Sequence, residues 1–202
     1  MTFIKTCTTI FASVAALMAP LCSIANASAA ETAALAALPM VILVRHAEKA
    51  DDKAADPVLS AAGIARAEAL AVALKDAGVT AIITTTLQRT ILTAKPIAAA
   101  HGIMPQTIPI QRDGLKLHID AVTAAIRGHR AQKNAVVLVV GHSNTVPLIV
   151  NALGGPPLPI LCEADYSSLF VVTPASSGGV RVVRSQFGAA SKTDVMEHEG
   201  CQ

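Results

Sequence analysis

Short apolar runs alternate with helical patterns from residue 40 onward. Apolar residues recur at helical spacing over about 60–77, 88–100, 118–132 and 144–153. Between these segments lie four β-favouring runs: MVILV (40–44), VTAIIT (79–84), QTIPI (106–110) and AVVLVV (135–140). Strand runs without polar alternation that are separated by helices are typical of a parallel sheet covered on both faces. The pattern therefore predicts an α/β fold, with AVVLVV near the centre of the sheet.

Local signals refine this outline. Ser60 is the expected N-cap of the helix that begins after it, and Gly78 stands just past its end. Pro96 lies inside the second helical pattern, where we expect a kink or a break. Near the end of the chain, SSLFVVT (167–173) and VRVVRSQF (180–187) flank Ser-Gly-Gly, which indicates a β-hairpin.

The first 30 residues have the pattern of a secretory signal peptide. Lys5 precedes the apolar run TIFASVAALMAPLCSIA, and Ala25-Asn26-Ala27 or Ala27-Ser28-Ala29 fits the cleavage site. The alternative is a retained membrane anchor, but Pro20 interrupts the run before it reaches the roughly 20 residues that a spanning helix needs. We therefore expect residues 1–30 to be removed, 31–39 to form a lead-in, and 40–202 to form one domain. We therefore expect the mature chain to be periplasmic or secreted and not to be inserted in a membrane.

Export changes the interpretation of cysteines and charge. Cys162 and Cys201 remain after cleavage, and in an oxidising compartment they can form an intramolecular disulfide; two free thiols are the alternative. Neither has a histidine at zinc-ligand spacing, so no metal site is expected. Loss of Lys5 reduces the 16 basic residues to 15, against 14 acidic residues. Without a basic stripe, nucleic acid is not an expected partner.

Polar residues follow the predicted strands where their carboxyl ends meet. MVILV leads into Arg45-His46, AVVLVV into Gly141-His142-Ser143-Asn144, and the segment TTTLQRT brings Arg89 to the start of a helix. Ligands of open parallel sheets bind at this edge. Arginine pairs with phosphate oxygens through two hydrogen bonds, an imidazole nitrogen can attack phosphorus, and the helix after Asn144 would direct N–H groups at the anion. The set predicts phosphoryl transfer that requires no cofactor.

The motifs RHAEK, LSAAGIARA, TTTLQRTILTA and VVGHSNT, in this order, resemble the histidine phosphatase superfamily. The resemblance covers about residues 41–172 and implies a three-layer α/β/α sandwich with a mostly parallel central sheet. It further implies that His46 becomes phosphorylated and that Arg45, Arg89 and His142 complete the phosphate pocket. Ser60, Gly63 and Arg66 match a segment that packs beside the pocket and has a structural role. Ala47 stands where many members have glycine, and Thr84-Thr85-Thr86 where a serine is common.

The family's general acid is a carboxylate that follows the helix of the middle arginine. Asp113 and Asp120 occupy that region, and Asp113 is preferred because it follows the third strand; a turn or helix cap explains it equally well. Glu48 could instead orient the site, whereas Asp51, Asp52 and Asp56 fit solvent-facing loop charges.

The expected function is hydrolysis of a small phosphorylated substrate through a phosphohistidine intermediate. Only 52 residues separate Arg89 from His142, which leaves little room to enclose a bisphosphorylated sugar acid, so mutase activity fits poorly. Two alternatives stay open. One is a phosphate- or phosphoprotein-binding module with a degraded active site. The other is a protein phosphohistidine phosphatase, although export separates the chain from such partners.

Overall fold

The computed structural model describes residues 38–50, 53–111 and 114–191. Within these residues, six strands form one sheet in the order β3-β2-β4-β1-β5-β6. The pairs β3–β2, β2–β4 and β4–β1 are parallel, whereas the pairs β1–β5 and β5–β6 are antiparallel. The sheet is therefore mostly parallel, as expected. Their bounds are β1 Met40–Arg45, β2 Ala81–Thr84, β3 Gln106–Thr107, β4 Val136–Gly141, β5 Ser168–Pro174 and β6 Val180–Gln186. The prediction that AVVLVV is central is confirmed, because β4 lies between β2 and β1 and is buried along its whole length.

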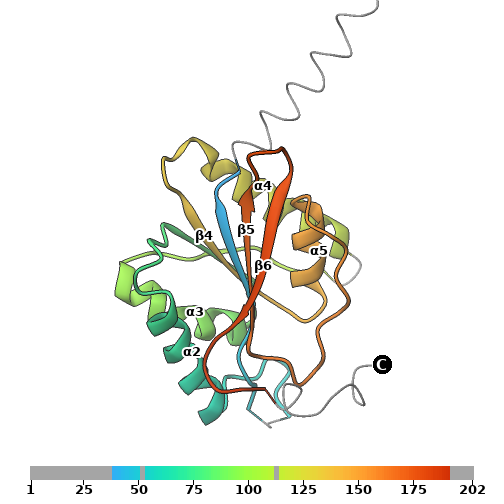
Figure 1. Cartoon of the computed structure of the whole chain (residues 1–202). Coiled ribbons are helices and arrows are strands. Elements are labelled where there is room, and N and C mark those ends of the chain that lie inside the picture. The colour runs from blue at the N-terminus through green and yellow to red at the C-terminus, as the bar shows by residue number, and fades with distance from the viewer. Residues whose placement is uncertain (1–37, 51–52, 112–113, 192–202) are drawn as a thin grey trace, which may run out of the picture.

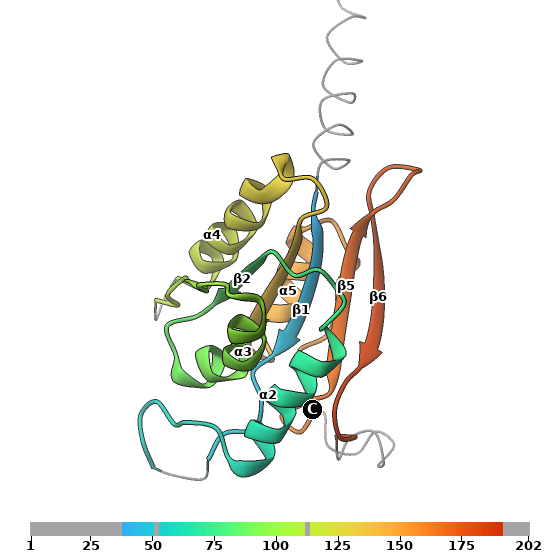
Figure 2. The ribbon, with the colours of Figure 1, turned by 90° about the vertical axis from the view of Figure 1, so that its left-hand side faces the viewer.

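Helices cover both faces of this sheet (Figures 1 and 2). In the described part of the chain they are α2 Ala61–Ala73, α3 Gln88–His101, α4 Leu115–Gly128 and α5 Thr145–Ala152, with a 3₁₀ turn at His129–Ala131. Helices α2 and α3 pack side by side on one face, and α4 and α5 on the other. The three-layer α/β/α sandwich is therefore confirmed.

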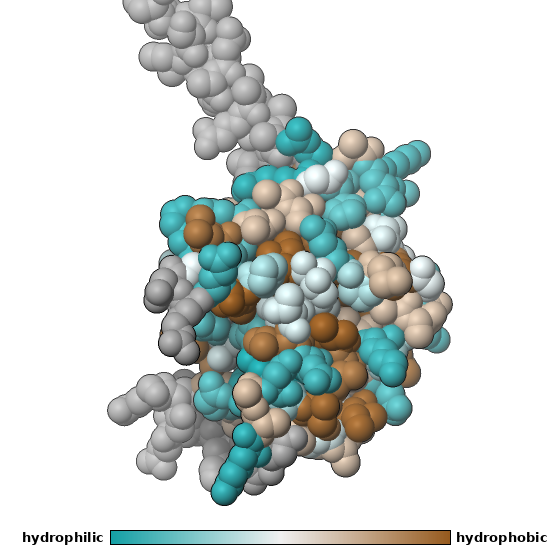
Figure 3. Space-filling view, turned by 180° about the vertical axis from the view of Figure 1, so that it is seen from behind, coloured by the Kyte–Doolittle hydropathy of each residue, from teal (hydrophilic) through white to brown (hydrophobic). Residues whose placement is uncertain are grey.

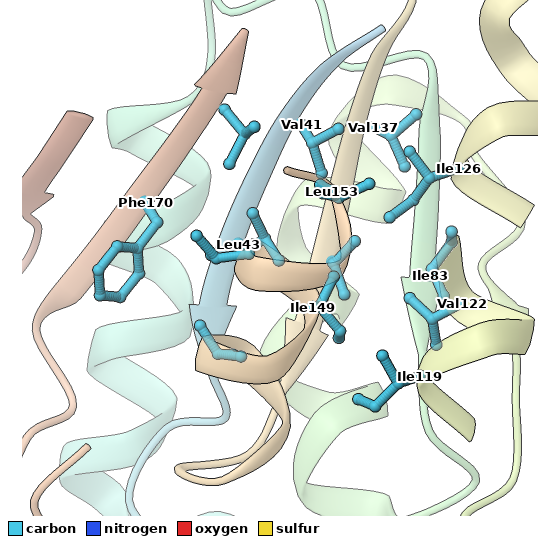
Figure 4. Close-up of a cluster of buried hydrophobic side chains, with 14 of the residues drawn as sticks. Val41, Leu43, Ile83, Ile119, Val122, Ile126, Val137, Ile149, Leu153 and Phe170 are labelled. Carbon is cyan, nitrogen blue, oxygen red and sulfur yellow. The ribbon is translucent and has the colours of Figure 1, made fainter. Parts of the chain in front are cut away.

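The core is split in two by the alternation of side chains along the strands. Val41 and Leu43 of β1 pack with Ile149 of α5 in the cluster that Figure 4 shows. Ile42 and Val44 point the other way and join the cluster with α2 and α3. Both faces of β1 are thus apolar and buried, which explains why its sequence shows no polar alternation before Arg45.

Several elements differ from the sequence prediction. Helix α3 continues through Pro96 without a break, because a proline removes a single backbone hydrogen bond and the neighbouring turns keep theirs. The third strand retains only Gln106 and Thr107, both exposed at the edge of the sheet. Helix α4 begins three residues earlier than predicted, at Leu115.

An apolar groove of about 450 Å³ lies between α2 and α3. Its lining includes Val58, Ile64, Leu92 and Pro96, and exposed apolar side chains appear as brown patches in the lower half of Figure 3. Ile64 of α2 lines this groove with 54% of its surface exposed.

The expected signal peptide, most of the lead-in, Asp113 and Cys201 lie outside the described residues. The Cys162–Cys201 pairing therefore stays a prediction. Among the described helices, none is long and apolar enough to cross a bilayer.

Candidate active site

The pairing of β1 with β4 brings the two motif histidines together. In the register of these parallel strands, Arg45 is the partner of Gly141, so His46 and His142 each follow directly after paired positions. The His46 amide donates to the Gly141 carbonyl at 2.9 Å. The two imidazole rings lie with centroids 5.2 Å apart and planes inclined by 63°. The predicted convergence of the histidines at the sheet edge is thus found in the structure.

The ring of His46 is fixed by the backbone next to it. Its Nδ1 lies 2.8 Å from the carbonyl oxygen of Ala47, which can only accept a hydrogen bond, so Nδ1 carries the proton. The loop is held in turn by α3, because the Ala47 amide donates to the Thr93 hydroxyl at 2.9 Å. The lone pair of a neutral His46 therefore resides on Nε2, the atom that a nucleophilic role requires.

His142 is joined to the threonines that precede α3. Its Nε2 lies 3.2 Å from Thr85 Oγ1, and Thr85 Oγ1 lies 2.9 Å from Thr90 Oγ1. The Thr90 hydroxyl donates to the Leu87 carbonyl at 2.8 Å. This series of hydrogen bonds therefore ends at a backbone acceptor. On the other side, the His142 amide donates to Thr145 Oγ1, at the start of α5, at 2.8 Å. His142 is therefore positioned from both α5 and the β2–α3 connection.

Both imidazoles are neutral at physiological pH in this environment. Burial lowers the pKa of His46 to about 4, with Arg45 and Arg89 adding to the decrease and the Ala47 hydrogen bond opposing it. Burial also lowers the pKa of His142 to about 3, with His46 and Arg89 contributing. A neutral His46 is the form that can attack an electrophile.

These pKa values predict that the protein loses stability in mild acid. In the unfolded chain a histidine takes up a proton below about pH 6.5, whereas the buried ring of His46 stays neutral until about pH 4 and that of His142 until about pH 3. Between these pH values the unfolded state binds more protons, so the free energy of unfolding falls as the pH falls, by about 1.4 kcal/mol per pH unit for each such histidine.

Urea unfolding between pH 7 and pH 4, in phosphate-free buffer, measures this slope. The variant His142→Gln should show a shallower slope than the wild type, and His101→Ala, at the end of α3, should keep the wild-type slope. His118, which is also buried with a lowered pKa, contributes equally in all three proteins. Equal slopes in wild type and His142→Gln would contradict the prediction.

Arg45, which was expected to bind phosphate, also binds the protein backbone. Its side chain is 3% exposed, and Nη1 donates to three backbone carbonyls of the loop after α5, those of Cys162 at 2.7 Å, Glu163 at 2.8 Å and Asp165 at 3.2 Å. The guanidinium also lies over the ring of Tyr166, 4.3 Å from its centroid. Arg45 therefore fastens this loop beside the histidines, while its Nε is buried without a hydrogen-bond partner in the described structure.

Arg89 lies in the first turn of α3, as predicted, and lines the same pocket. Its Nη1 lies 3.7 Å from Asp56 Oδ1, and its Nε is buried without a hydrogen-bond partner in the described structure. Asp56 is not the solvent-facing charge that the sequence suggested. Both of its carboxylate oxygens accept from the amide of Gln88, at 3.0 and 3.1 Å, so it caps the first turn of α3 and lies next to Arg89.

The four predicted residues line one polar pocket of about 510 Å³. Asn144 lines it as well, directly before the first residue of α5, as expected. Sequence reasoning missed the remaining lining residues, which are Lys49, Leu87, Ile110, Ser143 and Glu163. Of the acid candidates, Asp120 lies on the exposed surface of α4 in an ion pair with Lys116, whereas Asp113 lies outside the described residues.

The segment LSAAGIARA packs beside the pocket. Ser60 caps α2 by accepting from the Gly63 amide at 3.1 Å, as predicted. A Cβ atom at Gly63 would lie 2.2 Å from the carbonyl oxygen of Glu48, so only glycine allows this close approach. Arg66 binds the Glu48 carboxylate through Nε and Nη2 and the carbonyls of Phe187 and Ala189 through Nη1.

Comparison with known proteins finds a family model that matches part of the chain. Residues 41–116 match the model of the histidine phosphatase superfamily (branch 1). No curated protein matches the sequence.

Solved structures share the fold. The protein histidine phosphatase SixA complexed with tungstate is 21% identical with a TM-score of 0.55, over 73% of this chain and 96% of that one. A mycobacterial glucosyl-3-phosphoglycerate phosphatase bound to inorganic phosphate is 15% identical with a TM-score of 0.55, over 75% and 98%. A putative phosphohistidine phosphatase SixA from Agrobacterium tumefaciens is 21% identical with a TM-score of 0.52, over 76% and 99%.

Proposed function

Since this chain has the histidine phosphatase fold and matches that superfamily over residues 41–116, we propose that it is a phosphomonoesterase that acts through a phosphohistidine at His46. One observation carries the proposal. The Nδ1 of a buried, neutral His46 is tied to the Ala47 carbonyl, so Nε2 is available in a pocket that also contains Arg45, Arg89 and His142. Two guanidinium groups and two imidazoles around one small pocket suit a tetrahedral anion.

In the first step, the lone pair of His46 Nε2 forms a bond to phosphorus and the ester P–O bond breaks. Nδ1 keeps its proton, so the phosphorylated ring becomes cationic, and the Ala47 carbonyl 2.8 Å away stabilises that N–H. Charge on the equatorial oxygens would be stabilised by Arg45, Arg89 and the N-terminus of α5. The dianion would also raise the pKa of His142 and favour its protonated, hydrogen-bond-donating form.

The electron pair of the broken bond passes to the leaving oxygen, which takes a proton from an acid. Asp113 remains our proposed donor, because Asp120 is engaged with Lys116 on the exposed face of α4. In the second step a water oxygen attacks phosphorus, the N–P bond breaks, and the electron pair returns to Nε2. The proton of the water restores the acid, and inorganic phosphate leaves.

The substrate class is a small phosphorylated compound. The pocket of about 510 Å³ has room for a phosphoryl group and a short leaving group, and it is bordered by polar and charged side chains. The structural relatives include one named for phosphorylated histidine in proteins and one named for a phosphorylated sugar acid, so the fold serves both kinds of substrate. If the signal peptide is removed as expected, the enzyme meets its substrate in the periplasm or outside the cell.

Trapping of the intermediate tests the proposal. Wild-type protein mixed with ³²P-labelled phosphate ester and quenched in alkaline detergent should retain label, and the label should disappear in acid, because a phosphohistidine is stable in base and labile in acid. Quenched samples of His46→Ala should carry none. Binding of phosphate without label and without release of product would instead select the binding module.

A further inference from the structure

The hydrogen bonds of Arg45 leave one edge of its guanidinium for an anion. Nη1 is fully used by the three carbonyls of Cys162, Glu163 and Asp165. The other edge, formed by Nε and Nη2, is the one that can bind two oxygens of a phosphate at once. Nε has no hydrogen-bond partner in the described structure, and Nη2 donates to Glu163 Oε2 at 2.7 Å. A carboxylate thus binds one of the two nitrogens that a phosphate would use.

Within the described part of the chain, the Glu163 carboxylate has Arg45 as its polar partner. Its side chain is 82% exposed, whereas that of Arg45 is 3% exposed. The Glu163 backbone is fixed independently, because its carbonyl accepts from Arg45 Nη1 at 2.8 Å. The carboxylate can therefore leave Nη2 and enter solvent while the loop stays in place. An ion pair with one partner in water is readily exchanged for another anion.

We propose that the Glu163 carboxylate substitutes for a phosphate oxygen in the empty pocket and is displaced when phosphate or a phosphorylated substrate binds. The proposal rests on the function proposed above and concerns its regulation. Because an anion that binds Nε and Nη2 together competes with this contact and lies near the carboxylate, Glu163 weakens the binding of inorganic phosphate. The residue thereby promotes release of the product and sets the affinity of the pocket for anions.

Two other roles for Glu163 lead to different results. A carboxylate that only anchors Arg45 would support the pocket, so its removal would weaken phosphate binding. A carboxylate that donates the proton to the leaving group would leave phosphate affinity unchanged and lower kcat when replaced. Of these three roles, only competition with phosphate predicts that removal of the Glu163 carboxylate tightens phosphate binding.

The experiment measures the Kd of inorganic phosphate and of vanadate by calorimetry for the wild type, Glu163→Gln and Glu163→Ala. Loss of one charge-assisted contact and of a nearby like charge should lower both Kd values by about tenfold in both variants. Glu68→Gln, an exposed carboxylate of α2 outside the pocket, makes the same change in net charge and should leave Kd unchanged.

An unchanged or higher Kd in Glu163→Gln overturns the inference, as does a fall in kcat at constant Kd. If the wild type hydrolyses substrate but these variants bind phosphate no more tightly, the inference alone fails. If the wild type binds neither anion, the proposed function fails with it. A similar tightening in Glu68→Gln would assign the effect to net charge and also overturn the proposal.

Discussion

Replacement of His46 by alanine is expected to lower kcat/KM for p-nitrophenyl phosphate on the order of 10⁵-fold, because the variant lacks the atom that bonds to phosphorus. The backbone that presents this residue should persist, since the His46 amide is bound to the Gly141 carbonyl irrespective of the side chain. Arg45 and Arg89 also remain, so inorganic phosphate should still bind within about tenfold of the wild-type affinity. The measurements are initial rates at neutral pH and calorimetric titration with phosphate.

His101→Ala is the matched control, because it removes an imidazole at the end of α3 and leaves the pocket intact. Its rate should equal that of the wild type. Residual turnover by His46→Ala within tenfold of the wild type would contradict a covalent intermediate at this residue. Loss of both turnover and phosphate binding, with an unchanged unfolding midpoint, would show that His46 binds the anion rather than attacking it.

The ion pair of Arg66 with Glu48 is expected to dominate the stability of the loop behind the pocket. The side chain of Arg66 is 5% exposed and that of Glu48 is 22% exposed. The Arg66 guanidinium also binds the carbonyls of Phe187 and Ala189. One side chain therefore joins α2, the loop after β1 and the segment after β6. Arg66→Met leaves a largely buried carboxylate and two carbonyls without these donors. We expect a loss of about 3 kcal/mol in the free energy of unfolding, measured in urea.

The ion pair between Lys116 and Asp120 is the control for this prediction. Its nitrogen–oxygen distance of 2.6 Å is shorter than the 2.8 Å of the buried pair, yet its side chains are 87% and 55% exposed. Solvent screens such a pair, so Lys116→Met should cost about 0.5 kcal/mol or less. The double variant Glu48→Gln/Arg66→Met should recover part of the loss, because it removes the unpaired charge. Equal losses in Arg66→Met and Lys116→Met would contradict the argument from burial.

Much of the fold could be predicted because its strands and helices differ sharply in pattern. The uninterrupted run AVVLVV allows no exposed face, and it occupies the most buried strand. The third strand was overestimated, since QTIPI shows apolar alternation but pairs with β2 only at Gln106 and Thr107. The alternative of a break at Pro96 was wrong for a physical reason: a proline removes one hydrogen bond, and the packing of Ala94, Ile97 and Ala98 against the sheet compensates for it.

The site could be predicted where sequence position determines spatial position. Arg45, His46 and His142 follow strand ends, and parallel strands gather such residues at one edge. The contribution of Glu163 could not be predicted, because it reaches Arg45 from a loop 118 residues away that has no periodic pattern. The contact of Asp56 with α3 was also missed, because an aspartate 32 residues away from Gln88 carries no local signal of a helix cap.

The parallel register of β1 with β4 has a consequence for how this molecule tolerates change in length. Side chains alternate between the two faces at each step of a strand, so one extra residue inside either strand would carry its histidine to the opposite layer and separate the two rings. The β5–β6 turn has no such relation to the rings, because it follows neither of the two strands that carry them. Insertions are therefore best placed in that turn, and the two central strands must keep their number of residues.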